Sequence, residues 1–170
     1  MPARTVSLIP HPACPPGPVA RVQAEVRRQG GRLWLRFEAE GDIAAVRWPA
    51  PGRGRGDELW RHSCFEGFIG RPGGYLEVNL SPSGRWATYG FVGYRDGMSR
   101  ASETAEVLGF ARGDAQAALE AVADLPSQPG PMGLGAVIEA QDGRLSYWAL
   151  AHPSDKPDFH HPDSFVLDLP

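Results

Sequence analysis

Glycine and proline recur so often along this chain that long helices have little room in it. The 170 residues include 21 glycines and 17 prolines. Glycine inside a helix costs conformational entropy, and proline there removes a hydrogen bond and clashes with the preceding turn. Such punctuation favours many short strands joined by turns. We therefore expect less than about one-tenth of the residues in α-helix, against a usual third.

Two alternating runs flank a glycine pair near the start of the chain. Residues 21–27 and 32–38 both alternate apolar with polar or charged side chains, and Gly30 and Gly31 stand between them. A period of two is the pattern of a strand with one buried face. Glycines between two such runs are typical of a tight turn, so we predict a β-hairpin here.

Several later segments also carry strand-forming residues bounded by turn residues. We expect strands in the ranges 43–48, 63–69, 75–80, 86–94, 134–140, 145–151 and 165–169. Between two of these segments, Asp142 and Gly143 predict a two-residue hairpin loop, which would place Val137 opposite Trp148.

The range 114–125 permits two interpretations. Its composition favours a helix with Asp114 as the N-cap, whereas the alternation around Leu119 favours a strand. In either case, about nine short strands predict an all-β fold, an antiparallel two-sheet β-sandwich or jelly roll with little or no helix. At this length we expect a single domain, 1–170, in which 1–17 forms an irregular N-terminal segment.

Charge and cysteine content narrow the classes of partner. The formal net charge of −3 argues against nucleic-acid binding, which needs a basic face to neutralise phosphates. No apolar run approaches the roughly 18 residues that indicate a membrane span. The N-terminal residues lack the apolar stretch of a secretion signal, and only two cysteines, Cys14 and Cys64, are present. We therefore expect a cytoplasmic protein with reduced thiols, and neither nucleic acid nor membrane as a partner.

A stretch in the middle of the chain carries a recognisable order of residues. A Trp precedes Cys-Phe-Glu-x-Phe at 64–68, a turn follows, and an aromatic-led strand at 75–80 runs into Ser-Pro-x-Gly at 81–84. Together with the segment 147–160, this order resembles the DOMON-like superfamily. The similarity is to the branch related to family-nine carbohydrate-binding modules, and to its small stand-alone bacterial members.

This resemblance extends from Leu33 to the C-terminal end. It implies an antiparallel β-sandwich and a strand rather than a helix at 114–125. It also implies a ligand-binding module, since sugars and haem are the ligands known across the superfamily. Fold-level analogy does not by itself select between them.

The strand at 75–80 presents a polar face that suits a sugar. Glu77 and Asn79 lie on the face opposite to its leucines and valine, and Glu66 on the preceding strand is within reach if the two strands pair. Binding a sugar takes a flat aromatic surface beside fixed polar groups. The residues that we predict to bind a ligand combine both kinds: Trp60, Glu66, Glu77, Asn79, Trp86 and Arg95. The alternative is that the carboxylates and an arginine only form an ion-paired network within the sheet.

Histidines gather near the C-terminal end. His152, Asp158, His160 and His161 offer nitrogen and oxygen ligands for zinc. However, His160 and His161 point to opposite sides of an extended chain, and no cysteine pair accompanies them. We therefore expect a loop whose side chains satisfy backbone groups, and no bound metal.

Little in the sequence indicates catalysis or a cofactor. A Gly-x-Ser-x-Gly motif, a phosphate-binding loop and a dinucleotide fingerprint are absent. Cys64 lies in an apolar strand, where a free cysteine packs as a small hydrophobe. We predict a non-catalytic domain without a cofactor that binds a carbohydrate or another small polar ligand. The alternatives are a protein-interaction module that uses a sheet face or edge, and a haem-binding domain, whose axial Met and His pair has no match here.

Overall fold

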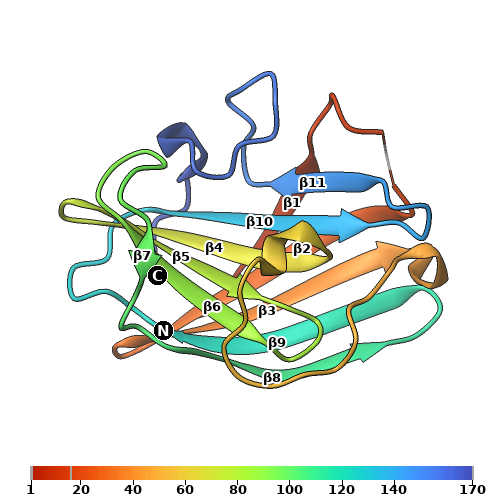
Figure 1. Ribbon diagram of the computed structural model, residues 1–170, viewed down its shortest axis with the longest axis horizontal. Coiled ribbons are helices and arrows are strands. Elements are labelled where there is room, and N and C mark those ends of the chain that lie inside the picture. Colours follow the sequence, from red (N-terminus) through yellow and green to blue (C-terminus); the bar gives the residue numbers. More distant parts are fainter. Residues whose placement is uncertain (1, 16, 170) are drawn as a thin grey trace.

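The computed structural model describes residues 2–15 and 17–169, and strands make up most of their regular structure (Figure 1). The strands are β1 (Arg4–Pro10), β2 (Val19–Gln29), β3 (Arg32–Gly41), β4 (Cys64–Arg71), β5 (Gly74–Leu80), β6 (Trp86–Phe91), β7 (Ser99–Arg100), β8 (Ala105–Arg112), β9 (Gln116–Asp124), β10 (Met132–Glu139) and β11 (Leu145–Ala149). The helical elements of the described residues are 3₁₀ turns: η1 (Ile43–Ala45), η2 (Leu59–Arg61) and η3 (Pro162–Ser164). The expected all-β chain with little or no helix is confirmed, and none of these turns is long and apolar enough to cross a membrane.

The strands belong to one antiparallel sheet that curls on itself, in the order β7-β6-β5-β4-β10-β11-β1-β2-β3-β9-β8. Strand β1 joins its two halves. It pairs with β2, where Thr5 lies opposite Glu25, and its far end pairs with β11, where Ile9 lies opposite Ala149. The prediction of two separate sheets is therefore not met, because β1 makes the sheet continuous.

The prediction of an irregular segment at 1–17 is wrong for residues 4–10, which form β1. Val6 and Leu8 alternate with Thr5 and Ser7, and Leu8 is buried in the core, but the apolar Ile9 ends the alternation. This alternation is too short to identify a strand by itself, and pairing on both sides fixes it. Residues 1 and 16 of the predicted segment lie outside the described residues.

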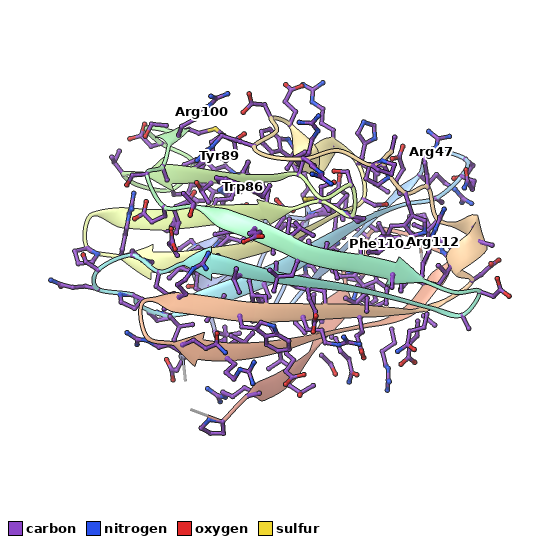
Figure 2. The ribbon with its side chains drawn as sticks, turned by 90° about the horizontal axis from the view of Figure 1, so that it is seen from below. Arg47, Trp86, Tyr89, Arg100, Phe110 and Arg112 are labelled. Carbon is purple, nitrogen blue, oxygen red and sulfur yellow. The ribbon has the colours of Figure 1, made fainter. Side chains whose placement is uncertain are left out.

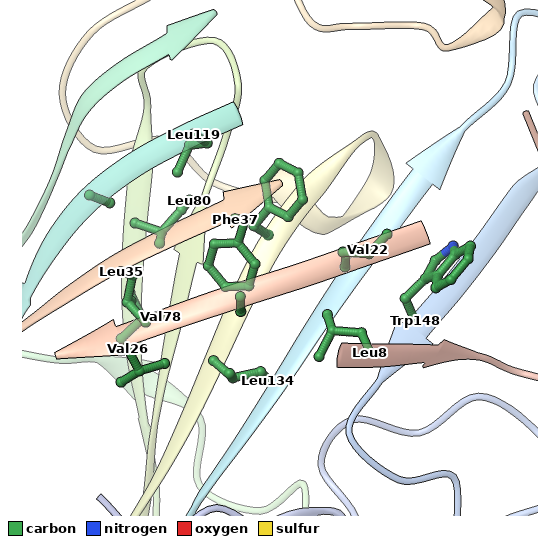
Figure 3. Packing of buried hydrophobic residues seen from close by; sticks show 14 of the residues in the cluster. Leu8, Val22, Val26, Leu35, Phe37, Val78, Leu80, Leu119, Leu134 and Trp148 are labelled. Carbon is green, nitrogen blue, oxygen red and sulfur yellow. The ribbon is translucent and has the colours of Figure 1, made fainter. Parts of the chain in front are cut away.

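The main core lies between the two halves of the curled sheet (Figure 3). One half contributes inward side chains such as Val22, Phe37 and Leu119, and the other contributes Phe65 and Val78. The rings of Phe37 and Phe65 stack across the core with their centroids 4.9 Å apart. Burying each side chain of this size contributes about 1.5–3 kcal/mol to stability, so the core holds the two halves together.

The first predicted hairpin is confirmed. Gln29 pairs with Arg32, and Gly30 has a left-handed φ of +61° at the turn. The range 114–125, for which helix and strand were both considered, contains strand β9. Pairing with β3 and β8 on its two sides overrides the helical propensity of its alanines.

Two predicted strands are absent. In the range 43–48 the chain forms η1, and only Val46 makes a bridge, to the residue that follows β10. In the range 165–169, Leu167 alone bridges to Met132. Strands β4 and β11 already pair with the two sides of β10, so a further full strand has no free side to pair with. Met132 lies in the part of β10 that does not pair with β11, which leaves it open to the single bridge from Leu167.

The loop between β10 and β11 is one residue longer than predicted. Val137 pairs with Tyr147 rather than with Trp148, because Gln141 joins the loop. The backbone and side-chain N–H groups of Gln141 donate to carbonyl groups at the end of η1, outside the hairpin. Gly143, with a φ of +85°, completes a three-residue loop. Relative to the predicted register, β11 is shifted by one residue along β10, which reverses the faces of its side chains. Tyr147 and Val137 are directly opposite each other and therefore lie on the same side of the sheet.

Gly74 and Gly73 make a matched test of the turn before β5. A Cβ at Gly74, whose φ is +145°, would stand 1.7 Å from the carbonyl oxygen of Phe91, whereas Gly73, whose φ is +76°, has nothing within 4 Å. We expect Gly74→Ala to destabilise the fold by about 3 kcal/mol or more, and Gly73→Ala by about 1 kcal/mol. Thermal unfolding of the two variants measures this, and equal losses would contradict the prediction.

Candidate ligand pocket

A pocket of about 320 Å³ opens on the face of β4 and β5 that points away from the main core. Its floor takes a residue from each of five neighbouring strands: Phe91 (β6), Glu77 (β5), Glu66 (β4), Val137 (β10) and Tyr147 (β11). Its walls come from outside the sheet: Trp60 in η2, Arg95 and Met98 after β6, and Pro157, Phe159 and His160 before η3. The pocket therefore exists because three loop segments meet over one half of the sheet.

Strand alternation turns two glutamates toward this pocket. Leu76 and Val78 of β5 point into the main core, so Glu77 between them points the other way. Glu66 of β4 lies directly opposite Asn79 of β5, which places the two glutamates diagonally across the ladder. Both are only 3% exposed.

Burial raises the pKa of both carboxyl groups. The pKa of Glu66 lies well above its ordinary value, chiefly through burial and then through the charge of Glu77 and a hydrogen bond with it. Burial also raises the pKa of Glu77 to about 7, although the hydrogen bond with Glu66 and the charge of Arg95 oppose the rise. Both carboxyl groups therefore hold a proton to higher pH than free glutamates do, and burial together with the charge of Glu77 favours the protonated form of Glu66.

Asn79 follows Glu77 on the same face of β5 and is completely buried. Its side chain is close enough to lower the pKa of Glu77, but the geometry falls short of a full hydrogen bond. Among the described residues, neither its amide nitrogen nor its amide oxygen has a hydrogen-bond partner. Because buried amides are nearly always hydrogen-bonded, this side chain is a spare donor and acceptor beside the glutamates.

Polar contacts hold the loop wall against the sheet. Nη2 of Arg95 donates to Oδ1 of Asp158 at 2.8 Å, and the hydroxyl of Tyr75 lies 2.7 Å from Nδ1 of His160. That hydroxyl accepts from the backbone N–H of Arg95, so it is free to donate to His160. Burial and then the charge of Arg95 lower the pKa of His160 to about 4. The imidazole is therefore neutral at pH 7, with Nε2 3.8 Å from the Glu77 carboxylate.

Aromatic rings supply the apolar surface of the pocket. Phe91 stacks on Tyr75 with the ring centroids 4.7 Å apart, and Trp60 is half-buried. Phe159 lies against Gly135 of β10, where a Cβ would stand 2.9 Å from the ring. The glycine therefore makes the seat for Phe159. The result is flat apolar surface beside buried carboxyl groups.

The structure brings together four of the six predicted ligand-binding residues: Trp60, Glu66, Glu77 and Arg95. Asn79 is buried on the same face but does not line the pocket. Trp86 lies elsewhere. It packs against the main core, with the guanidinium of Arg55 4.7 Å from its ring centroid, on the side of the molecule drawn in Figure 2. Within the described residues Arg95 pairs with Asp158 and with neither glutamate, so the alternative of a glutamate–arginine network is not found.

The C-terminal loop contributes wall residues that the sequence did not identify, among them Phe159 and His160. The loop has no strand periodicity, and only the resemblance at 147–160 drew attention to it. The expected bonding to backbone groups is present for His152, whose Nε2 bonds a carbonyl of β1, and for His161, which caps η3. The described residues contain no group of three or more His, Cys, Asp or Glu arranged to hold a metal ion.

Comparison with known proteins identifies a similar fold. No protein-family model matches the sequence, and no curated protein matches it. Among solved structures, the chain is similar to a proposed carbohydrate-binding protein from Bacteroides uniformis ATCC 8492, with a TM-score of 0.60 and 17% sequence identity. The similarity covers 88% of this chain and 78% of that one. At this identity it shows a shared fold, one that a proposed carbohydrate-binding protein also adopts.

The raised pKa of Glu77 predicts a pH-dependent contribution to stability. Its folded pKa of about 7 exceeds the ordinary 4.5, so the stability that its proton contributes is complete below about pH 4.5 and is lost as the pH rises through 7. Glu77→Gln removes this dependence. We expect the free energy of unfolding of the variant to rise relative to that of the wild type by about 1–3 kcal/mol as the pH increases from roughly 5 to 8. His160 acts in the opposite direction, but it is present in both proteins and cancels in the difference.

Thermal unfolding of both proteins across this range is the measurement. Glu106→Gln, at an exposed position on edge strand β8, controls for the loss of a surface carboxylate. A difference between Glu77→Gln and wild type that stays constant with pH would contradict the prediction.

Proposed function

We propose that this protein binds a carbohydrate or a similar small polar ligand in the pocket, without transforming it. The observation that supports this most is a pair of buried carboxyl groups on the pocket floor beside the rings of Trp60, Phe91 and Phe159. The ring face of a sugar packs on flat aromatic surface, and its hydroxyls need fixed donors and acceptors. A protonated carboxyl group is both donor and acceptor, and the raised pKa values of Glu66 and Glu77 favour that form.

The environment of Cys64 favours binding over covalent catalysis. Burial raises the pKa of its thiol well above its ordinary value, so the thiolate needed for nucleophilic attack is disfavoured.

Two similarities favour the same proposal. The Bacteroides uniformis protein that shares the fold is a proposed carbohydrate-binding protein. The motifs of β4, β5 and the turn after β5 resemble the DOMON-like superfamily, in which sugars are among the ligands. Neither similarity identifies binding residues in this chain. The pocket provides them, with buried carboxyl groups beside aromatic rings.

A thermal-shift screen with neutral mono- and disaccharides tests the proposal. A sugar present at about 100 times its Kd should stabilise the protein by about 2.7 kcal/mol, a rise in Tm of roughly 5–10 °C. We expect Trp60→Ala and Glu66→Gln each to weaken binding by about tenfold or more, as loss of roughly 1.4 kcal/mol requires.

Trp34→Ala is the matched control for this screen. Trp34 lies on β3 beneath the guanidinium of Arg27, 4.8 Å from its ring centroid, and takes no part in the pocket. We expect this variant to bind as the wild type does. The proposal fails if no sugar raises Tm, or if Trp34→Ala weakens binding as much as Trp60→Ala.

A further inference from the structure

The glutamates on the pocket floor face no free cation within the described residues. Arg95, the arginine that lines the pocket, already pairs with Asp158 at 2.8 Å. His160 is the other basic side chain at the wall, and its pKa of about 4 makes it neutral near pH 7. Any charge on the pair therefore has no directly paired cation, and the charge of Arg95 acts on Glu77 only from its ion pair with Asp158.

The other titratable side chains around the floor are the hydroxyls of three tyrosines and the thiol of Cys64, whose pKa burial also raises. Tyr147 lines the pocket from β11, and Tyr75 and Tyr89 flank Glu77 on neighbouring positions. Burial raises the pKa of all three, so they stay neutral near pH 7. They contribute no positive charge, and Tyr89 donates its proton to Asp57, away from the floor.

Asn79 adds an independent observation at the same place. It is completely buried on the face that carries Glu77, opposite Glu66 in the ladder, and both polar atoms of its side chain lack a partner among the described residues. A buried amide in this state loses its hydrogen bonds to water without replacement. Two carboxyl groups without a paired cation thus lie on the floor, and a buried amide without a partner lies beside them, outside the pocket lining.

We propose that the ligand is an amino sugar whose ammonium group binds between the carboxyl groups of Glu66 and Glu77 while its ring rests on the aromatic wall. This inference rests on the proposed function and adds the charge of the ligand to it. An ammonium group has three N–H donors and one positive charge, which suits two carboxyl groups that face the pocket. Hydrogen bonds between charged partners are roughly twice as strong as neutral ones, and aromatic faces attract cations. A sugar acid, in contrast, would bring a third carboxyl group to the floor.

Proton release gives this proposal a signature besides affinity. The buried carboxyl groups lie on the floor without a paired cation and favour holding a proton, which an ammonium group would displace to solvent because the carboxylate oxygens then accept from its N–H groups. A neutral sugar leaves that proton in place. Titration calorimetry in two buffers of different ionisation enthalpy measures the protons released on binding.

The experiment compares sugars that differ in one group only. Glucose, galactose and mannose are each measured against their amino-deoxy derivatives, with the amino group at each available carbon, and against the corresponding uronates. We expect at least one amino sugar to bind about tenfold or more tightly than its parent, with release of up to about one proton, and the uronates to bind more weakly than the parents.

Variants assign the preference to the floor. Glu77→Gln should abolish both the preference for the amine and the proton release, whereas Trp60→Ala should weaken amino and parent sugars alike. If the glutamine variant does not fold, the comparison of ligands on the wild-type protein still decides. Parent sugars that bind as tightly as every amino derivative overturn this inference and leave the proposed function standing. If neither kind of sugar binds, the proposed function fails, and this inference with it.

Discussion

Strands β4 and β5 are buried on both faces, and the pocket depends on this. Phe65 and Leu76 pack into the main core, whereas Phe68 and Tyr75 pack into a second apolar cluster beneath the loops. Antiparallel sheets commonly leave one face in water. Here the loops cover that face, so the polar residues on it lose contact with water. A ligand that enters the pocket can supply the hydrogen bonds that water no longer makes.

The buried glutamates are costly to the fold. A carboxyl group removed from water without a cation is stabilised by remaining protonated, which is how Glu66 and Glu77 behave. Apolar residues at these positions would pack with less loss. Buried polar groups of this kind are typical of a preorganised binding site, because the donors and acceptors are already fixed when the ligand binds.

Loops far apart in the sequence define the pocket wall through a few polar contacts. Arg95, after β6, reaches Asp158 in the C-terminal loop, where Tyr94 also donates to the same carboxylate. The backbone of Arg95 has a left-handed φ of +49°, which is unfavourable for a residue with a side chain. Strain of this kind is retained where surrounding contacts over-determine the conformation, as they do at this wall.

The sequence by itself determined the class of fold and the faces of its best-defined strands. Glycine and proline frequency excluded long helices, and alternation correctly placed Glu66 and Glu77 on one side of neighbouring strands, because a period of two is a local property of extended backbone. The same reasoning could not separate Trp86, which packs against the main core, from the site residues. A tryptophan in a strand gives the same sequence pattern whether its side chain faces the core or a ligand. Only the tertiary structure decided that β1 bridges both halves of the sheet, that the loop before β11 takes in Gln141, and that Phe159 and His160 cover the glutamates. Each of these features depends on contacts between residues that are distant along the chain. Such contacts stabilise the structure but produce no periodic pattern in the sequence of the residues that make them.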